Sequence, residues 1–262
     1  MNLTLPDELA QQVAQLGEPE AELQSSAAHY ALSILGGVLA LLLGLALLGF
    51  LALGLWLNPA LKIKSGFVLF KMGAIGLVLL GAGVGLLRRG RSARGLRVIV
   101  CADGLARVQG DQVEMLRWED VNRVQRAVHF KKEQITVRTP VQLTLVGCDG
   151  KTMTFDESLA GLPELRRLVE EHTLQHMLPP AREALVAGET IAFGDVAIGP
   201  QGLHAGGKTL TWDLCGAAEA SKGLFIVQPT EGRRPFCKVE VSAVPNVHVL
   251  LALAEEVRQR HV

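Results

Sequence analysis

Apolar residues form two long runs in the first third of the chain. The first run, Tyr30–Leu57, has 28 residues without a charge, and the second, Gly66–Leu87, is interrupted only by Lys71. A helix rises about 1.5 Å per residue, so about 20 residues cross a hydrocarbon core of about 30 Å. The connector at 58–65 is short and contains a helix-stopping proline. This pattern predicts an antiparallel transmembrane hairpin.

Beyond residue 95 the apolar positions follow a different pattern. Residues 141–145 alternate between apolar and polar, as do residues 153–155 after the turn sequence Gly-Cys-Asp-Gly at 147–150. Alternation around Asp-Gly predicts a β-hairpin. Apolar residues at helical spacing follow at 165–169 and again at 247–254. We therefore expect short antiparallel strands followed by an amphipathic helix, twice.

A set of short motifs also occurs twice. Each copy has a Gly-Leu pair that begins a strand, a tryptophan followed by an acidic residue, and a proline that starts the closing helix. The copies are Gly104-Leu105, Trp118 and Pro163, and then Gly202-Leu203, Trp212 and Pro245. The offset is 98 at the leucine, 94 at the tryptophan and 82 at the proline. We interpret these motifs as an internal repeat whose second copy is shortened.

These patterns predict an α+β protein with four parts. They are an acidic tail at 1–29, transmembrane helices at 30–57 and 66–87, a first repeat unit at 95–178 and a shorter second unit at 188–262. Each unit is expected to be a small antiparallel barrel or sandwich capped by its C-terminal helix. Residues 179–189, with Pro179-Pro180 and Gly188, are expected to connect the two units.

The repeated motifs behind a two-span hairpin resemble uncharacterised bacterial membrane proteins with pleckstrin-homology-like (PH-like) domains. The resemblance covers roughly residues 95–262. It implies a seven-stranded bent sheet capped by one helix in each unit, and a role in binding rather than catalysis. Lipid-binding PH domains commonly carry several basic residues around the first hairpin. Here the hairpin near 107–111 has one Arg and one Asp, which does not favour an inositol-phosphate ligand.

Charge predicts the orientation of the hairpin. The whole chain has 26 basic and 26 acidic residues and no net charge, so nothing indicates a nucleic-acid partner. A cluster of arginines directly follows the second apolar run, namely Arg88, Arg89, Arg91, Arg94 and Arg97. The positive-inside rule places this cluster in the cytoplasm, together with the N-terminus and both repeat units. The first four are expected to contact anionic lipid headgroups at the inner membrane.

Small residues within the apolar runs indicate close helix packing. Gly81 and Gly85 form a GxxxG pair, and Gly36, Ala40 and Gly44 form a row with the same spacing. Such rows let the backbones of membrane helices approach one another. The two spans are expected to pack together, and Gly81 and Gly85 are a candidate surface for homo-oligomerisation.

Three features could carry chemistry. Residues 202–209 read GLHAGGKT and match the P-loop pattern, but an alternating strand-like run follows, so a β-hairpin with an exposed Lys208 is expected. His172 and His176 lie four residues apart on a helix and could share a metal, although no further ligand is near in sequence. Residues 166, 167, 170 and 171 form a charged, solvated helix face, and the four cysteines form no CxxC pair.

The sequence as a whole favours a membrane-anchored, non-enzymatic scaffold without a cofactor or a metal, which binds an unknown protein partner and contacts the bilayer. One alternative is a membrane-bound enzyme that binds or hydrolyses nucleotide through GLHAGGKT. Another is an oligomeric membrane assembly that packs through its glycine-rich spans.

Overall fold

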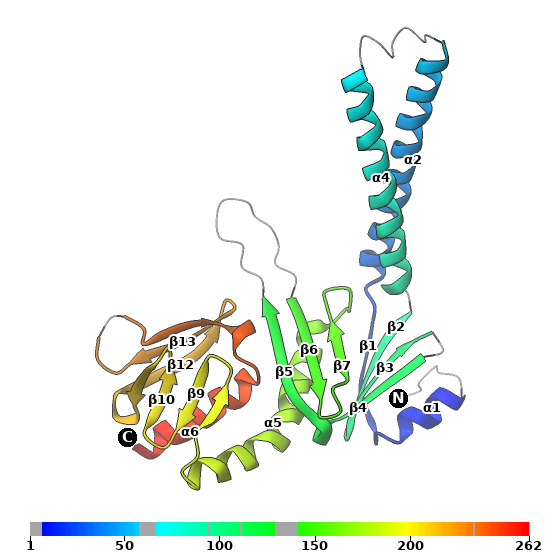
Figure 1. Ribbon diagram of the computed structural model, residues 1–262. Coiled ribbons are helices and arrows are strands. Elements are labelled where there is room, and N and C mark those ends of the chain that lie inside the picture. The colour runs from blue at the N-terminus through cyan, green and yellow to red at the C-terminus, as the bar shows by residue number, and fades with distance from the viewer. Residues whose placement is uncertain are drawn as a thin grey trace. The chain divides into compact units, whose positions relative to one another are not determined.

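The described part of the chain contains two long apolar helices and four small antiparallel sheets (Figure 1). The computed structural model describes residues 7–57, 66–93, 95–110, 112–128, 141–232 and 234–261. Two compact units make up the chain, one at Gln24–Arg97 and the other formed by the segments before and after it. The expected mixed α+β class is confirmed.

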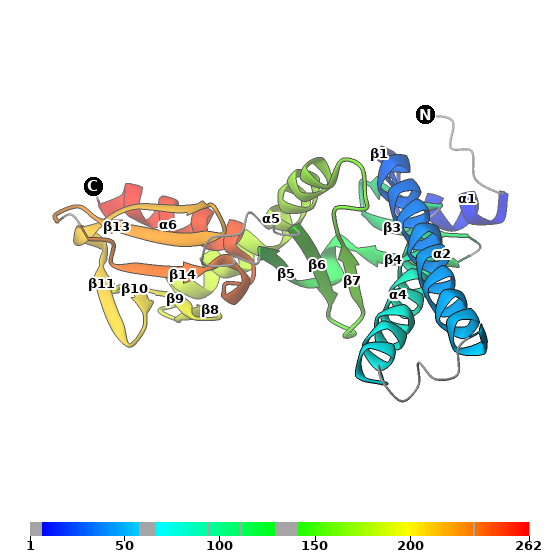
Figure 2. The same cartoon turned by 90° about the horizontal axis from the view of Figure 1, so that it is seen from above.

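The unit at Gln24–Arg97 consists of helices α2 (Ala27–Leu57) and α4 (Gly66–Ala93). Both are long and apolar enough to cross a membrane, over Tyr30–Gly54 and Phe70–Arg88. Apolar helices therefore lie at both predicted positions, and α4 extends beyond its predicted end. The two helices run side by side in both views (Figures 1 and 2).

Two pairs of glycines let α2 and α4 approach closely. A Cβ at Gly83 would lie 2.9 Å from the Gly37 carbonyl oxygen, and a Cβ at Gly44 would lie 3.0 Å from that of Gly76. The contacts are spaced seven residues apart on each helix, so they form one seam. The predicted pair Gly81 and Gly85 is not part of it, because a Cβ at either position would meet nothing within 4 Å. Self-association through this open face stays a prediction.

The predicted acidic tail is folded rather than extended. It contains helix α1 (Asp7–Ala14) and strand β1 (Pro19–Gln24), the edge strand of a sheet in the order β1-β2-β3-β4. The other strands are β2 (Leu96–Cys101), β3 (Gly104–Gln109) and β4 (Gln112–Arg117). The connection from β1 to β2 therefore contains both apolar helices. The hairpin near 107–111, which the sequence suggested as the first, is the third connection of this sheet.

Helix α1 and the residues directly after it pack on one face of this sheet. Val13 and Leu16, 1% and 2% exposed, form a small apolar cluster with Ile99, Cys101, Ala106 and Val108. Strand β2 is consequently buried on both faces, which explains its continuous run of apolar residues. The acidic composition of residues 1–29 did not indicate that α1 packs on the sheet, because a short helix needs apolar residues on only one side to do so.

A four-stranded sheet, a 3₁₀ turn, a three-stranded sheet and a helix follow one another twice along the chain, and the second series has one further 3₁₀ turn before its helix. The first series continues with a 3₁₀ turn at Trp118–Asp120, a sheet of β5 (Val121–Val128), β6 (Val141–Gly147) and β7 (Thr152–Phe155), and helix α5 (Leu162–Val186). The second series has β8 (Ile191–Phe193), β9 (Val196–Gly199), β10 (Gly202–Ala205) and β11 (Lys208–Thr211), a 3₁₀ turn at Trp212–Leu214, β12 (Cys215–Ser221), β13 (Leu224–Pro229) and β14 (Cys237–Glu240), a 3₁₀ turn at Val241–Ala243, and α6 (Val247–His261).

We call β1–β7 with the first half of α5 module 1, and β8–β14 with α6 module 2. In each module a four-stranded sheet is followed by a three-stranded sheet and a helix. Figure 2 shows α6 lying along the strands of module 2.

The two tryptophans occupy equivalent places in the two modules. Trp118 Nε1 donates to the Cys101 carbonyl at 3.0 Å, and Trp212 Nε1 donates to the Gly199 carbonyl at 3.1 Å. Each acceptor is the last residue of the second strand of its four-stranded sheet. Both indole rings are buried. An indole needs a partner for its N–H when buried, and the same solution is used twice.

The Gly-Leu motifs have a steric cause. Gly104 pairs with Arg117 and Gly202 pairs with Thr211 across the neighbouring strand. A Cβ at either glycine would collide with a carbonyl oxygen of that strand, Leu116 O or Leu210 O. The leucines that follow, Leu105 and Leu203, are fully buried.

The proline-based predictions differ from the structure. Helix α5 does not end before the predicted connection but continues through Pro179 and Pro180 to Val186. Its second half packs on the core of module 2 through Leu174, Met177, Leu178, Ala181 and Leu185. Burial of these side chains offsets the backbone hydrogen bonds that the prolines remove.

The start of α6 was also predicted incorrectly. Pro245 lies before the helix, and the residue that precedes the first turn is Asn246, with φ 54°. Its carbonyl accepts from the amides of Val249 and Leu250, as the Gly161 carbonyl accepts from those of Glu164 and Leu165 in α5. Gly161 is left-handed too, with φ 88°. The helices therefore correspond at an offset of 85 rather than 82.

We expect Gly83→Leu to destabilise the helix pair by about 1–3 kcal/mol, because a side chain there overpacks the seam against Leu41 and the Gly37 carbonyl. Gly81→Leu is the matched control on the open face of α4 and should change stability by less than about 0.5 kcal/mol. Unfolding of the detergent-solubilised protein, followed by circular dichroism, measures both. Equal losses in the two variants would contradict the assigned seam.

Candidate functional site

The segment that matches a P-loop is a β-hairpin. Strands β10 and β11 pair antiparallel up to Ala205 and Lys208, and Gly206 and Gly207 between them have φ 55° and 74°. Two positive φ values identify a type I′ turn, which suits a two-residue hairpin. A P-loop instead needs a loop that opens a helix. GLHAGGKT therefore forms no phosphate cradle, and Lys208 is exposed as expected.

The histidines predicted as possible metal ligands lie in a different setting. His172 Nε2 is 2.9 Å from Glu20 Oε2, and its ring stacks on Trp118 with centroids 4.9 Å apart. This contact ties α5 to strand β1. His176 is exposed on the next turn. Among the described residues no group of three or more His, Cys, Asp or Glu side chains is placed to hold a metal ion.

The four cysteines are reduced thiols in different environments. Cys101 and Cys215 are buried, whereas Cys237 is half-buried and Cys148 is exposed at the β6–β7 turn. Burial, with smaller contributions from Glu20 and Asp103, raises the pKa of Cys101 to about 11. A thiol with this pKa stays protonated near neutral pH and is not a nucleophile.

The two modules meet along the edge of β5. Asn246 Oδ1 accepts from the Val124 amide at 2.6 Å, and Asn246 Nδ2 donates to the Asn122 carbonyl at 3.1 Å. The Asn246 amide also donates to the Val124 carbonyl at 2.8 Å. One residue of module 2 thus pairs with β5 much as a neighbouring strand would. Gln125 Nε2 adds a bond to the Ser242 carbonyl at 2.8 Å.

Helices α5 and α6 complete this junction. Thr173, the one fully buried polar side chain among the described residues, bonds to the Val169 carbonyl at 2.6 Å and to His248 Nε2 at 2.9 Å. Further along, Arg182 binds Glu256 through two hydrogen bonds of 2.9 and 2.5 Å. Because α5 packs on the cores of both modules, these contacts hold them in one compact unit.

Charged side chains surround the buried end of the junction. Arg126 of β5 forms an ion pair with Glu170 of α5, and Arg166 lies 3.7 Å from the same carboxylate. The Arg126 and Glu170 side chains are only 14% and 20% exposed. Glu170 therefore does not belong to the solvated face predicted from the sequence, although Arg167 and Glu171 do, with a 3.0 Å ion pair.

Burial shifts the protonation equilibria of this cluster. It lowers the pKa of Arg126 and raises that of Glu170, in each case against the opposing effect of the partner charge. Burial, with a further contribution from Arg126, lowers the pKa of His248 to about 4. His248 is therefore neutral at physiological pH and acts as a structural hydrogen-bonding group.

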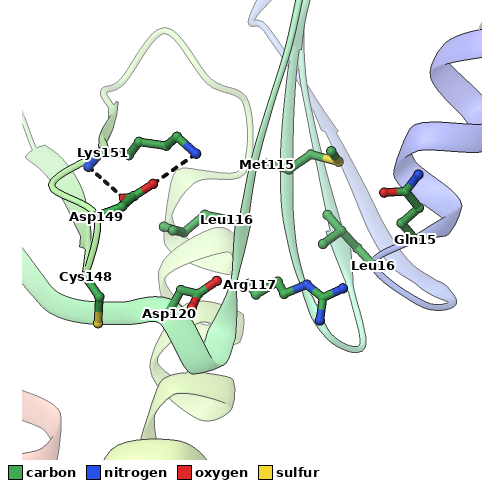
Figure 3. Close-up of a pocket in the computed structure, with 9 residues that line it drawn as sticks. All are labelled: Gln15, Leu16, Met115, Leu116, Arg117, Asp120, Cys148, Asp149 and Lys151. Atoms are coloured by element: carbon green, nitrogen blue, oxygen red, sulfur yellow. Dashed lines mark hydrogen bonds and ion pairs between the residues drawn. The ribbon is translucent and has the colours of Figure 1, made fainter.

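A pocket of about 500 Å³ opens beside strand β4 (Figure 3). Figure 3 shows Leu116 on the side of the β6–β7 turn, with Met115 and Arg117 on the side of Leu16. Three of its four charged lining groups are paired, since Lys151 Nζ lies 2.9 Å from Asp149 and Arg117 lies 3.3 Å from Glu119, and the fourth is Asp120. These charged groups make the lining of the pocket polar.

The arginines predicted to contact lipid lie at the end of α4. Arg88, Arg89 and Arg91 fall within the helix, and Arg88 is exposed. Arg94 lies outside the described residues. Lipid contact by these four residues stays a prediction.

The residues that hold the modules together were missed in the sequence. An asparagine before an apolar helical pattern is a recognised start signal, and it could have indicated Asn246 in place of Pro245. No comparable signal marks Gln125, Arg126 or His248, because their partners are more than 40 residues away.

Fold and junction together define an α+β protein with two helices able to cross a membrane and two modules of the same element order. The chain belongs to a family of unknown function, DUF6585, whose model matches residues 5–261. Searches of curated proteins and of solved structures found no match. Because the family match covers the helix pair and both modules, they form one family architecture.

We expect Asn246→Gly to destabilise the compact unit by about 1–3 kcal/mol. The substitution keeps the left-handed backbone but removes two inter-module bonds and leaves the buried Val124 amide without its partner. Lys222→Gly is the matched control, because Lys222 also has a positive φ of 49° but lies in an exposed turn. Denaturant midpoints measure both variants, and the contact is wrongly assigned if they respond alike.

Stability should also fall as the pH is lowered from about 6.5 to 4. The unfolded chain protonates His248 near its ordinary pKa of 6.5, whereas the folded chain does so only near 4, so protons favour unfolding in this window. The loss attributable to His248 is at most about 3 kcal/mol. His248→Gln should make the free energy of unfolding depend less on pH in this range. Glu170 is present in both proteins, so its own titration does not distinguish them. Parallel curves for the two proteins would refute this assignment.

Proposed function

We propose that this protein is a membrane-anchored, non-enzymatic scaffold that presents two PH-like modules at the cytoplasmic face of a bacterial inner membrane. The observation that carries the proposal is the repeated order of a four-stranded sheet, a three-stranded sheet and a helix. Seven strands and one helix are the elements that the sequence resemblance implies for each unit. The matching Trp118 and Trp212 contacts support descent of both modules from one ancestor.

The connectivity supports a single side of the membrane for both modules. Strand β1 precedes the helix pair and β2 follows it, and the two are neighbours in one sheet. The Ser25 amide donates to the Leu96 carbonyl at 2.9 Å, at the point where the chain leaves and re-enters. Two spans between them would return both ends to the same side, and the arginines from Arg88 onward support a cytoplasmic location for that side.

A binding role agrees with how the polar groups are used. Three of the four charged side chains that line the pocket beside β4 are engaged in the Lys151–Asp149 and Arg117–Glu119 pairs, and His172 and His248 serve as structural contacts. The hairpin formed by GLHAGGKT gives the nucleotide-hydrolysing alternative no site. Contact of Arg88, Arg89, Arg91 and Arg94 with anionic headgroups would hold the modules close to the bilayer.

The exposed thiol of Cys148 provides the test of this topology. In sealed spheroplasts a membrane-impermeant maleimide should leave the full-length protein unmodified, whereas inverted vesicles should allow labelling. Cys148→Ser controls for the other cysteines, of which Cys101 and Cys215 are buried. Labelling of Cys148 from outside the spheroplasts would overturn the proposed orientation.

The binding role needs a second readout in the same cells. A proximity-labelling enzyme fused after Val262 should mark a reproducible set of proteins that the same enzyme on an unrelated two-span anchor does not mark. A variant truncated after Val186 would not be a suitable control for the loss of module 2. It would keep the second half of α5, which belongs to the core of that module. Identical labelled sets from the two fusions would contradict a scaffold function.

A further inference from the structure

Module 1 has a separate cavity of about 300 Å³ between the first turn of α5, the beginning of β6 and the segment after β7. Its walls are mainly aliphatic and include Val141, Leu143, Leu159 and Leu162. Three of these are core residues, since Leu143, Leu159 and Leu162 are 1%, 3% and 5% exposed. The cavity therefore reaches the apolar interior, and its volume is at the lower end of the range for small-molecule sites.

Two guanidinium groups, those of Arg126 and Arg166, line the same cavity. They share one carboxylate, because Glu170 contacts both. The third charged group of the lining, Glu157, is engaged with the Val141 amide at 3.3 Å. Arg126 Nε is buried and has no hydrogen-bond partner among the described residues, and the Arg166 side chain is 46% exposed. The two arginines are balanced by the carboxylates of Glu170 and Glu157, but Arg126 Nε remains a buried donor without a partner among the described residues.

Burial lowers the pKa of Arg126, the attraction of Glu170 raises it, and repulsion by Arg166 lowers it further. An additional anion near the two guanidinium groups would relieve this repulsion, and a carboxylate suits arginine because it accepts charge-assisted hydrogen bonds. An aliphatic cavity with an unpaired guanidinium donor beside it suits a ligand that is apolar at one end and has a carboxylate at the other.

We propose that this cavity binds a single-chain amphiphile with an anionic head, of the medium-chain fatty acid class. The chain lies among Val141, Leu143, Leu159 and Leu162, and the carboxylate lies at Arg126 and Arg166. The inference rests on the proposed function in that it assigns a ligand to module 1 as a binding module. A membrane-anchored module is also close to a source of such amphiphiles.

The test is calorimetric titration of decanoate into the full-length protein in phosphatidylcholine nanodiscs, with empty nanodiscs as the background. Arg166→Gln should weaken binding about tenfold, because a charge-assisted contact is lost. Arg167→Gln is the matched control: Arg167 is the next residue on α5 but pairs with Glu171, and its loss should leave the affinity unchanged. Decanol, which has the same chain without the charge, should bind the wild-type protein about tenfold more weakly than decanoate does.

The cavity itself is tested by Val141→Trp, which adds bulk at a half-buried position of its wall and should abolish decanoate binding. Circular dichroism confirms that the variant is folded. The proposal is overturned if decanoate does not bind, if Arg166→Gln and Arg167→Gln bind equally well, or if folded Val141→Trp keeps the wild-type affinity. Any of these results with the Cys148 labelling pattern intact would leave the scaffold proposal standing and remove only this ligand.

Discussion

The pairing of β1 with β2 is the constraint on which the rest of the structure depends. The chain leaves the first sheet after Gln24, passes through both long helices and must return at Leu96 to the neighbouring strand. Only an antiparallel helix pair can do this. The seam of Gly37, Gly44, Gly76 and Gly83 allows such a pair to close tightly without side chains between the backbones.

Helix α5 imposes a second constraint, because it belongs to both modules. Its first half buries Leu165 and Val169, and its second half packs Met177 and Leu185 against the core of module 2. A shared helix brings the edge of β5 next to the segment before α6, where Asn246 pairs with it. The same arrangement places the neutral His248 of module 2 near the buried Arg126–Glu170 ion pair of module 1.

Proline and acidic residues were the misleading signals in the sequence. Pro179 and Pro180 disfavour a continuous helix locally, but burial of the apolar side chains around them outweighs that cost. Pro245 resembles a helix-starting residue, yet the left-handed Asn246 begins the helix. The segment before residue 25 reads as a solvated tail by charge, although Val13 and Leu16 are enough to dock it on the first sheet.

Local chemistry alone determined the two apolar helices and the Asp-Gly hairpin between β6 and β7. Each depends on the period and composition of a continuous segment, which a single sequence displays directly. The covering of β2 by α1, the sharing of α5 and the cluster around Arg126 were decided only by tertiary structure. They join residues far apart in the chain, and their stability comes from burial and pairing that exist only after those segments have met.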